Sequence, residues 1–362
     1  MAWLWRSSLG ALALLALLEI VLRLLPVSTA TQTAYYIDPA ILTYPPHHHF
    51  VLSTGWDLER PQQMQANNLG FVAQRDFSPN RDAIGLIGDS HIEAAALAAE
   101  QRPDVMLEAA LGGRRPVYGM GSPGTSLLDY AERVRFAATQ LQTQDFVLLI
   151  VPGDIRQSLC GSGQIAAPCV DPATGQSRNE LQPAPGALKQ VMRQSALAQY
   201  LFSQLKISLD AAPAALLGLP RQLLPGHASI KPAANAASGP ARDASQELEI
   251  RADAVAELFF ARIQPHVRGR LLLVLDRPFL PSFARADFEG DTDRFIAIAR
   301  AHGATVLDMA PVYAEHARRS QLLLAVSPQD QHHNALGVQV LARAMADAFQ
   351  SLSPAPASLG AP

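Results

Sequence analysis

Short, continuous apolar runs alternate along this chain with segments whose apolar residues recur at helical spacing. Runs of five or fewer residues with few charges are typical of strands buried on both faces, as in a parallel sheet. They occupy 83–87, 117–121, 147–151, 271–275 and 305–308, and helical periodicity follows at about 246–263, 292–302 and 335–349. Because strands and helices alternate, the pattern predicts an α/β fold with a five-stranded parallel sheet.

The first apolar run ends in Gly88-Asp89-Ser90, followed by good helix formers over 92–97. This predicts a strand, a sharp turn and a helix. A serine at such a turn lies at the carboxyl end of a strand, where open α/β sheets bind their ligands. Its Oγ can attack a substrate, and its backbone N–H can stabilise an oxyanion. A serine that only caps a helix would give the same tripeptide, so Ser90 needs a partner.

That partner is predicted in the loop that carries Asp330 and His332. In extended backbone, residues two apart point to the same side, so the carboxylate can hold the imidazole Nδ1–H. Nε2 is then left to accept a proton from a serine. The alternative is a polar loop that caps the last helix, with Asn334 as N-cap. With Ser90 upstream, the residues favour a Ser90, His332 and Asp330 triad.

Four blocks together resemble the SGNH hydrolases, also called GDSL esterases and lipases. The resemblance covers most of 83–349 and implies a flavodoxin-like three-layer sandwich, with Ser90 as nucleophile. The blocks are Gly88-Asp89-Ser90, residues 117–125, residues 147–155, and the Asp330/His332 loop with Asn334 and Gly337.

The resemblance also implies an oxyanion hole, with one departure from the family pattern. Ser90 and Gly124 would supply backbone N–H groups, but Gly153 stands where the family has an asparagine. Losing one such donor typically costs about 10²–10³ in rate. Three interpretations follow: Arg156 or Gln157 substitutes, two donors suffice, or the domain is catalytically weakened.

The N-terminal segment 3–26 is rich in leucine and alanine and long enough to cross a bilayer. Glu19 and Arg23, four residues apart, can pair on one helix face, a pair that similar membrane-anchored SGNH proteins often carry. Arg6 favours a cytoplasmic start, which would place the domain outside, in the periplasm or at the cell surface. The alternatives are a secreted protein whose signal peptide is cleaved near Ala30 and a buried core helix. We expect a retained anchor.

The predicted organisation has four parts. Residues 1–28 are the anchor or an uncleaved signal, and 29–80 a neck segment that packs on the domain. Residues 81–352 form the hydrolase domain, with a long insertion at about 156–245, and 353–362 form a disordered tail.

Composition and cysteine usage indicate which kinds of partner, and which cellular compartment, to expect for this chain. A formal net charge of −3 gives no reason to expect nucleic acid as a partner. The two cysteines, Cys160 and Cys169, lie in one Gly- and Pro-flanked loop and predict a disulfide in an oxidising compartment, with two free thiols as the alternative. No neighbouring ligands suggest zinc, and we expect neither a metal nor a cofactor.

These observations predict a serine ester hydrolase or O-acyltransferase that works through an acyl-enzyme. Membrane-anchored relatives of this layout are often linked to envelope or secreted polysaccharides. The resemblance therefore implies an acyl ester or acetylated carbohydrate as substrate, and polysaccharide machinery as a partner. The alternative is a catalytically degenerate domain that binds polysaccharide or acts as a scaffold, for which Gly153 is the one indication.

Overall fold

The computed structural model describes residues 2–162, 168–180, 184–205, 207, 241–278, 286–328 and 330–352. The chain divides into two compact units. The first combines Met1–Ala30, Val51–Pro61 and Pro185–Glu247, and the second combines Thr31–Phe50, Gln62–Ala184 and Leu248–Pro362. The expected tail and much of the insertion lie outside the described residues.

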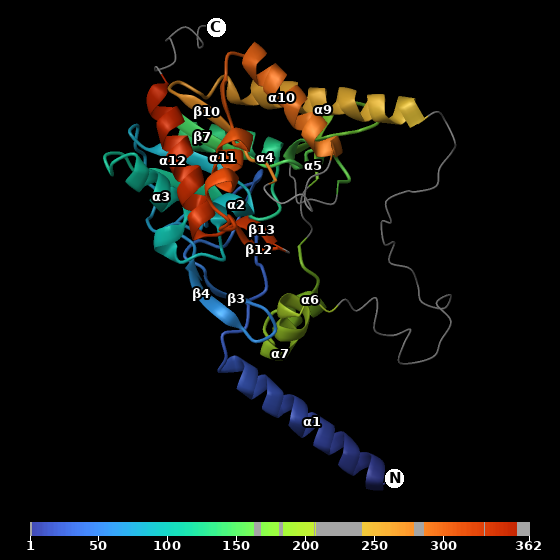
Figure 1. Ribbon diagram of the computed structural model, residues 1–362. Helices are drawn as coiled ribbons and strands as arrows, with labels where there is room; N and C mark the ends of the chain where they lie inside the picture. The colour runs from blue at the N-terminus through green and yellow to red at the C-terminus, as the bar shows by residue number, and fades with distance from the viewer. Residues whose placement is uncertain are drawn as a thin grey trace. The chain divides into compact units, whose positions relative to one another are not determined.

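The larger unit is built on the predicted parallel sheet (Figure 1). Its five strands are β5 (Ile84–Gly88), β6 (Val117–Gly121), β7 (Asp145–Ile150), β10 (Leu271–Leu275) and β11 (Thr305–Asp308). They lie in the order β11-β10-β7-β5-β6. Gly88 pairs with Gly121, and Ile87 with Leu148, so three strands end at the same edge. The predicted fold class is confirmed.

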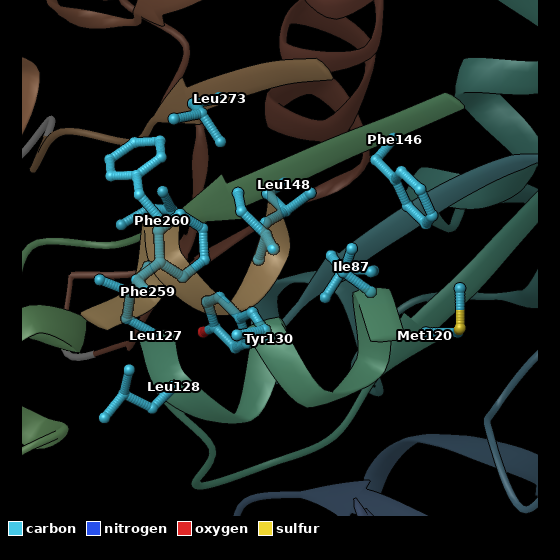
Figure 2. Close-up of a cluster of buried hydrophobic side chains, with 14 of the residues drawn as sticks. Ile87, Met120, Leu127, Leu128, Tyr130, Phe146, Leu148, Phe259, Phe260 and Leu273 are labelled. Atoms are coloured by element: carbon cyan, nitrogen blue, oxygen red, sulfur yellow. The ribbon is translucent and has the colours of Figure 1, made fainter. Parts of the chain in front are cut away.

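Helices cover both faces of this sheet. One face packs against α3 (Pro103–Ala110), α11 (Ala310–Arg319) and α12 (Ala335–Ser351). The other packs against α4 (Leu127–Gln140), the end of α9 (Ala241–Ile263) and α10 (Ala286–Ala301). Figure 2 shows this second core, in which Tyr130 of α4 and Phe259 and Phe260 of α9 pack against Leu148 and Leu273. Helix, sheet and helix make the three expected layers.

The helix expected at 92–97 is wrong in its bounds. The helix α2 (Ser90–Glu93) begins at the serine and ends after one turn, where Ala94 takes the left-handed φ of 47°. The chain then passes through η1 (Ala99–Gln101) before α3 begins. The physical reason is close packing: a Cβ on Gly121 would come within 2.3 Å of the Glu93 nitrogen. The turn is therefore pressed against the end of β6, and tertiary packing overrides the propensity of the alanine run.

Within the described residues, four two-stranded antiparallel sheets lie outside the main sheet, and the sequence did not predict them. They pair β1 (Ala34–Asp38) with β2 (Ile41–Thr43), β3 (His49–Thr54) with β4 (Glu59–Gln65), β8 (Pro168–Val170) with β9 (Ser177–Asn179), and β12 (Ala325–Ser327) with β13 (Asp330–His333).

The smaller unit contains α1 (Ala2–Arg23), α6 (Ala187–Met192), α7 (Ala196–Gln199) and η2 (Tyr200–Gln204). Its segment Trp5–Arg23 is long and apolar enough to cross a membrane, by length and composition. Arg23 Nε donates to Glu19 Oε1 at 2.8 Å, as the spacing of the two residues predicts.

Candidate active site

A strand–turn–helix connection presents Ser90 at the carboxyl edge of the sheet. Asp89 caps α2, and its Oδ1 accepts a hydrogen bond from the His91 nitrogen at 2.8 Å. Position 88 has no room for a side chain, because a Cβ there would lie 2.5 Å from Ile92 Cγ1. The buried Arg133 donates to the Gly88 carbonyl at 2.6 Å and to the Met120 carbonyl at 3.1 Å. The ends of β5 and β6 are thereby fixed beneath the serine.

The opposite side of the site is the β12–β13 hairpin, which leads directly into α12. Asn334 caps that helix by accepting a hydrogen bond from the Gly337 nitrogen at 2.9 Å. Its amide also donates to the Leu323 and Ala325 carbonyls at 2.7 and 2.9 Å. Helix capping and catalysis were alternatives in the sequence, but here the cap positions the hairpin that carries His332.

The structure brings Ser90, His332 and Asp330 together. Ser90 Oγ lies 2.8 Å from His332 Nε2, although the residues are 242 positions apart. His332 Nδ1 lies 2.5 Å from Asp330 Oδ1, which also accepts a hydrogen bond from the His332 backbone nitrogen at 3.0 Å. The hydrogen bond from the imidazole holds the pKa of Asp330 below its usual value, against partial burial. The aspartate is therefore ionised, and His332 is oriented to accept the serine proton.

A second histidine, which the sequence analysis missed, lies directly against the first. The His91 ring stacks on His332 with centroids 4.5 Å apart and an interplanar angle of 27°. His91 Nδ1 lies 3.1 Å from Asp89 Oδ1. Burial alone would lower the pKa of His91, but the nearby carboxylates, chiefly that of Asp89, raise it to about 9. A buried imidazolium therefore faces the candidate general base at neutral pH. The only sequence signal was a histidine next to Ser90.

Behind His91 lies a buried polar group that the motifs did not reveal. Tyr313 donates its hydroxyl proton to Asp276 Oδ1 at 2.6 Å, and its oxygen lies 2.9 Å from His333 Nε2. His91, Asp276 and His333 each place a potential metal-ligand atom within 4.8 Å of the others. Hydrogen bonds to Asp89 and Tyr313 already engage these groups, so the arrangement works as a hydrogen-bond network without requiring an ion.

The expected oxyanion donors lie at neighbouring strand ends. Gly124, in the turn after β6, has the left-handed φ of 71°, which favours glycine. In the part of the chain that the structure describes, neither the Ser90 nor the Gly124 N–H donates to a backbone carbonyl. Both N–H groups are therefore available to a substrate oxygen.

Gly153 caps α5 (Asp154–Gln157), just beyond the end of β7. A Cβ at position 153 would lie 2.9 Å from Gln157 Nε2, so the Gln157 amide fills the space in which a side chain at 153 would begin. Arg156, the other candidate substitute, forms an ion pair with Asp291. The geometry therefore distinguishes the two: Arg156 is engaged by a carboxylate, and Gln157 occupies the position of the absent side chain.

The carboxyl of Asp154 anchors the same turn. Its Oδ2 accepts hydrogen bonds from the Val151 nitrogen at 2.8 Å and the Tyr130 hydroxyl at 3.0 Å. Burial, together with the charge of Asp89, raises the pKa of Asp154 well above its usual value. A buried carboxyl thus holds the end of β7 beneath the site.

Cys160 and Cys169 form a disulfide with an S–S distance of 2.05 Å. The Cys160 nitrogen donates to the Val170 carbonyl at 2.9 Å, and the Val170 nitrogen to the Ser158 carbonyl at 2.9 Å. The bond therefore closes the segment that follows α5 and Gln157.

Comparisons with known proteins find likeness at the level of three-dimensional structure. No protein-family model matches the chain, and neither does any curated protein. An α/β hydrolase from the metagenome of Lake Arreo is 16% identical, with a TM-score of 0.41 over 76% of this chain and 98% of that one. A catalytic mutant of an acetylxylan esterase from Geobacillus stearothermophilus is 12% identical, with a TM-score of 0.40 over 75% and 95%. A member of the lipolytic G-D-S-L family from Veillonella parvula is 12% identical, with a TM-score of 0.38 over 75% and 99%. The chain is thus similar to G-D-S-L proteins and esterases at low identity, and we base its function on the residues of its own site.

Proposed function

We propose that this chain is a serine ester hydrolase or O-acyltransferase of the SGNH type. The observation that carries the proposal is the continuous contact from Ser90 Oγ to His332 Nε2 at 2.8 Å and from His332 Nδ1 to Asp330 Oδ1 at 2.5 Å. A nucleophile in contact with a base, which a third group orients, is the arrangement that acyl transfer requires.

In the proposed reaction His332 takes the Ser90 proton while Oγ attacks the ester carbonyl. The resulting imidazolium is stabilised by Asp330 and then protonates the leaving alcohol, which departs as the acyl-enzyme forms. An incoming hydroxyl, deprotonated by His332, attacks the acyl-enzyme, and His332 returns that proton to Ser90 Oγ as the acyl–Oγ bond breaks. When the acceptor is water the enzyme is an esterase, and when it is a sugar hydroxyl the enzyme is an O-acyltransferase.

The oxyanion would be held by the N–H groups of Ser90 and Gly124, with the Gln157 amide as a third donor. Support comes from the space at Gly153, which the Gln157 amide fills. Replacing Gln157 by Ala should lower kcat by about 10²-fold, the usual cost of one such donor. The double variant Gly153→Asn/Gln157→Ala, which returns an amide to the end of β7, should recover part of that loss. A single Gln157→Ala variant with wild-type kcat would show that the two backbone donors suffice.

We place the site outside the cytoplasm, on a chain anchored by α1. The apolar segment Trp5–Arg23 supports an anchor, and a disulfide between Cys160 and Cys169 fits an oxidising compartment. Acetylated carbohydrate of the cell envelope is the proposed substrate class, and the resemblance to membrane-anchored SGNH proteins is its support.

A covalent probe tests the catalytic proposal on the full chain in detergent. A fluorophosphonate should label the wild-type protein, and labelling and hydrolysis of 4-nitrophenyl acetate should both vanish in Ser90→Ala. Adding oligosaccharide acceptors and measuring acetylated product against free acetate would then separate transferase from esterase. A folded wild-type protein without labelling would overturn the catalytic assignment.

The second candidate function is a carbohydrate-binding domain without catalysis. Gly153 favours it, because the residue has no side chain to act as an oxyanion donor. The contact between Ser90 and His332 opposes it. An unlabelled protein that nevertheless binds acetylated polysaccharide would establish this candidate.

A further inference from the structure

Within the smaller unit, one carboxylate of the apolar helix α1 holds the start of α7. Glu19 of α1 accepts hydrogen bonds from the Ser195 hydroxyl at 2.8 Å, the Ala196 nitrogen at 3.0 Å and the Leu197 nitrogen at 2.9 Å. Arg23 donates to the Gln194 carbonyl at 3.0 Å. Glu19 lies four residues before the end of α1, which corresponds to about 6 Å along the helix axis. α7 therefore begins within about one turn of the end of the apolar segment.

A second set of hydrogen bonds attaches the turn that carries Trp56 to the same place. The Tyr200 hydroxyl donates to the Trp56 carbonyl at 2.7 Å, and Gln204 Nε2 donates to the Gly55 carbonyl at 2.6 Å. Gln204 Oε1 in turn accepts a hydrogen bond from the Ser28 nitrogen at 3.1 Å, just after the apolar helix. The 55–57 turn, η2 and the end of α1 thus form one hydrogen-bonded cluster (Figure 1).

This cluster, together with α6, which ends two residues before Gln194, exposes large apolar side chains. Leu24 is 82% exposed, Trp56 72%, Leu188 73% and Val191 65%. Leu188 and Val191 are three residues apart on α6 and therefore share a helix face. Lys189 and Arg193 stand beside them in the sequence, and Arg23 ends α1. Exposed leucine, valine and tryptophan flanked by basic residues are the composition of segments that lie in a membrane interface.

We infer that α6 and the Trp56 turn contact the surface of the bilayer that α1 crosses, and that they form a lipid-contacting layer around the anchor. The inference rests on the proposal that α1 spans a membrane, and it concerns what holds the extracytoplasmic side to that membrane. The occupant of this apolar surface is lipid because the hydrogen bonds of Glu19 keep α7 at the depth at which α1 ends. Arg23, Lys189 and Arg193 favour anionic headgroups there.

Tryptophan quenching tests the inference on the full chain in nanodiscs that contain phosphatidylglycerol and a brominated phosphatidylcholine. The three tryptophans are Trp3, Trp5 and Trp56. A Trp3→Phe/Trp5→Phe variant reports on Trp56 alone, and Trp3→Phe/Trp56→Phe reports on Trp5 of α1 as the control for insertion. Because the native cysteines form a disulfide, Leu188→Cys can carry an environment-sensitive fluorophore, with Gln190→Cys as the matched control on the opposite face of α6.

The expected result is a loss of Trp56 emission comparable to that of Trp5, and a blue-shifted probe at position 188 but not at position 190. If Trp5 is quenched while Trp56 and the probe at 188 report water, the inferred lipid contact of α6 and Trp56 is wrong. The proposal that α1 spans the membrane would still hold. If Trp5 is not quenched, the membrane-spanning proposal fails and the inference fails with it. Fluorophosphonate labelling of Ser90 in the same samples reports on the catalytic proposal separately.

Discussion

Replacing His91 by Gln should shift the pH dependence of the proposed serine chemistry. The His91 imidazolium lies face to face with His332, with ring centroids 4.5 Å apart. A positive charge there opposes the second positive charge that develops on His332 as it takes the Ser90 proton. Glutamine keeps a donor for Asp89 but removes the charge. His91→Gln should therefore acylate faster than the wild type at neutral pH, where His91 is charged.

Coulomb's law gives the size of the effect. Two unit charges separated by the observed 4.5 Å interact by about 3.7 kcal/mol at an effective dielectric constant of about 20, and by about 0.9 kcal/mol in water. The His332 side chain is 38% exposed, so solvent screens part of this interaction and a value between the two limits applies. About 1.5 kcal/mol corresponds to about a tenfold change in rate.

The assay is the second-order rate of phosphonylation of Ser90 between pH 5 and 9, which reports on the free enzyme. The wild-type rate should rise by up to about tenfold as the pH passes the His91 pKa of about 9, because the charge beside His332 is then lost. His91→Gln should have the higher rate already at pH 7 and show no such step, so the profile is extended to pH 10. His91→Lys is the matched control, since it keeps a positive charge while changing the packing.

A refutation would be a folded His91→Gln protein that reacts no faster than the wild type at pH 7. The charge on His91 would then have no influence on the charge that develops on His332. A slower protein that keeps the wild-type pH profile would assign His91 a packing role only. The groups that face His91 are Asp89, Asp154, Asp276, His332 and His333, so Asp276→Asn offers a second way to alter its charge environment.

Three further predictions concern the triad and the stability of the fold. Asp330→Asn should reduce kcat by about 10²–10⁴-fold in single-turnover acylation, because the imidazole loses its orienting carboxylate; an unchanged rate would remove Asp330 from the triad. Cys160→Ser/Cys169→Ser should lower the free energy of unfolding by about 2–3 kcal/mol in urea titrations, from the loss of a short closed loop; equal midpoints with and without the bond would contradict this. Gly70→Ala should destabilise the protein by about 2 kcal/mol or more, since Gly70 has φ +79 and a Cβ would lie 2.0 Å from the Tyr44 carbonyl oxygen; a wild-type melting temperature would show that this loop adapts.

The sheet could be predicted from the sequence because each of its strands is a self-contained signal. Runs such as 271–275 are apolar throughout and are bounded by charged or turn-forming residues, so their identification needs no distant partner. Ser90, Asp330 and His332 could be predicted for a similar reason: their spacing within short segments already limits the chemistry. The Glu19–Arg23 pair also depends only on helical spacing.

Features that arise from contacts between distant segments could not be predicted in the same way. His91 gains its role from stacking on His332, and α2 stops at Glu93 because β6 approaches at Gly121. The hydrogen bonds between Glu19 and the start of α7 join residues more than 170 positions apart. The local sequence does not show which distant segments come into contact, since each contact depends on the path of the whole chain.

The contact between Gly153 and Gln157 limits how an amide could be returned to this turn. A Cβ at 153 would lie 2.9 Å from Gln157 Nε2, which is the end of a flexible side chain, so an asparagine there would displace the amide without straining the backbone. The two amides therefore compete for one space. Gly153→Asn alone should exchange one amide for the other at the end of β7 and should not add a donor to the site.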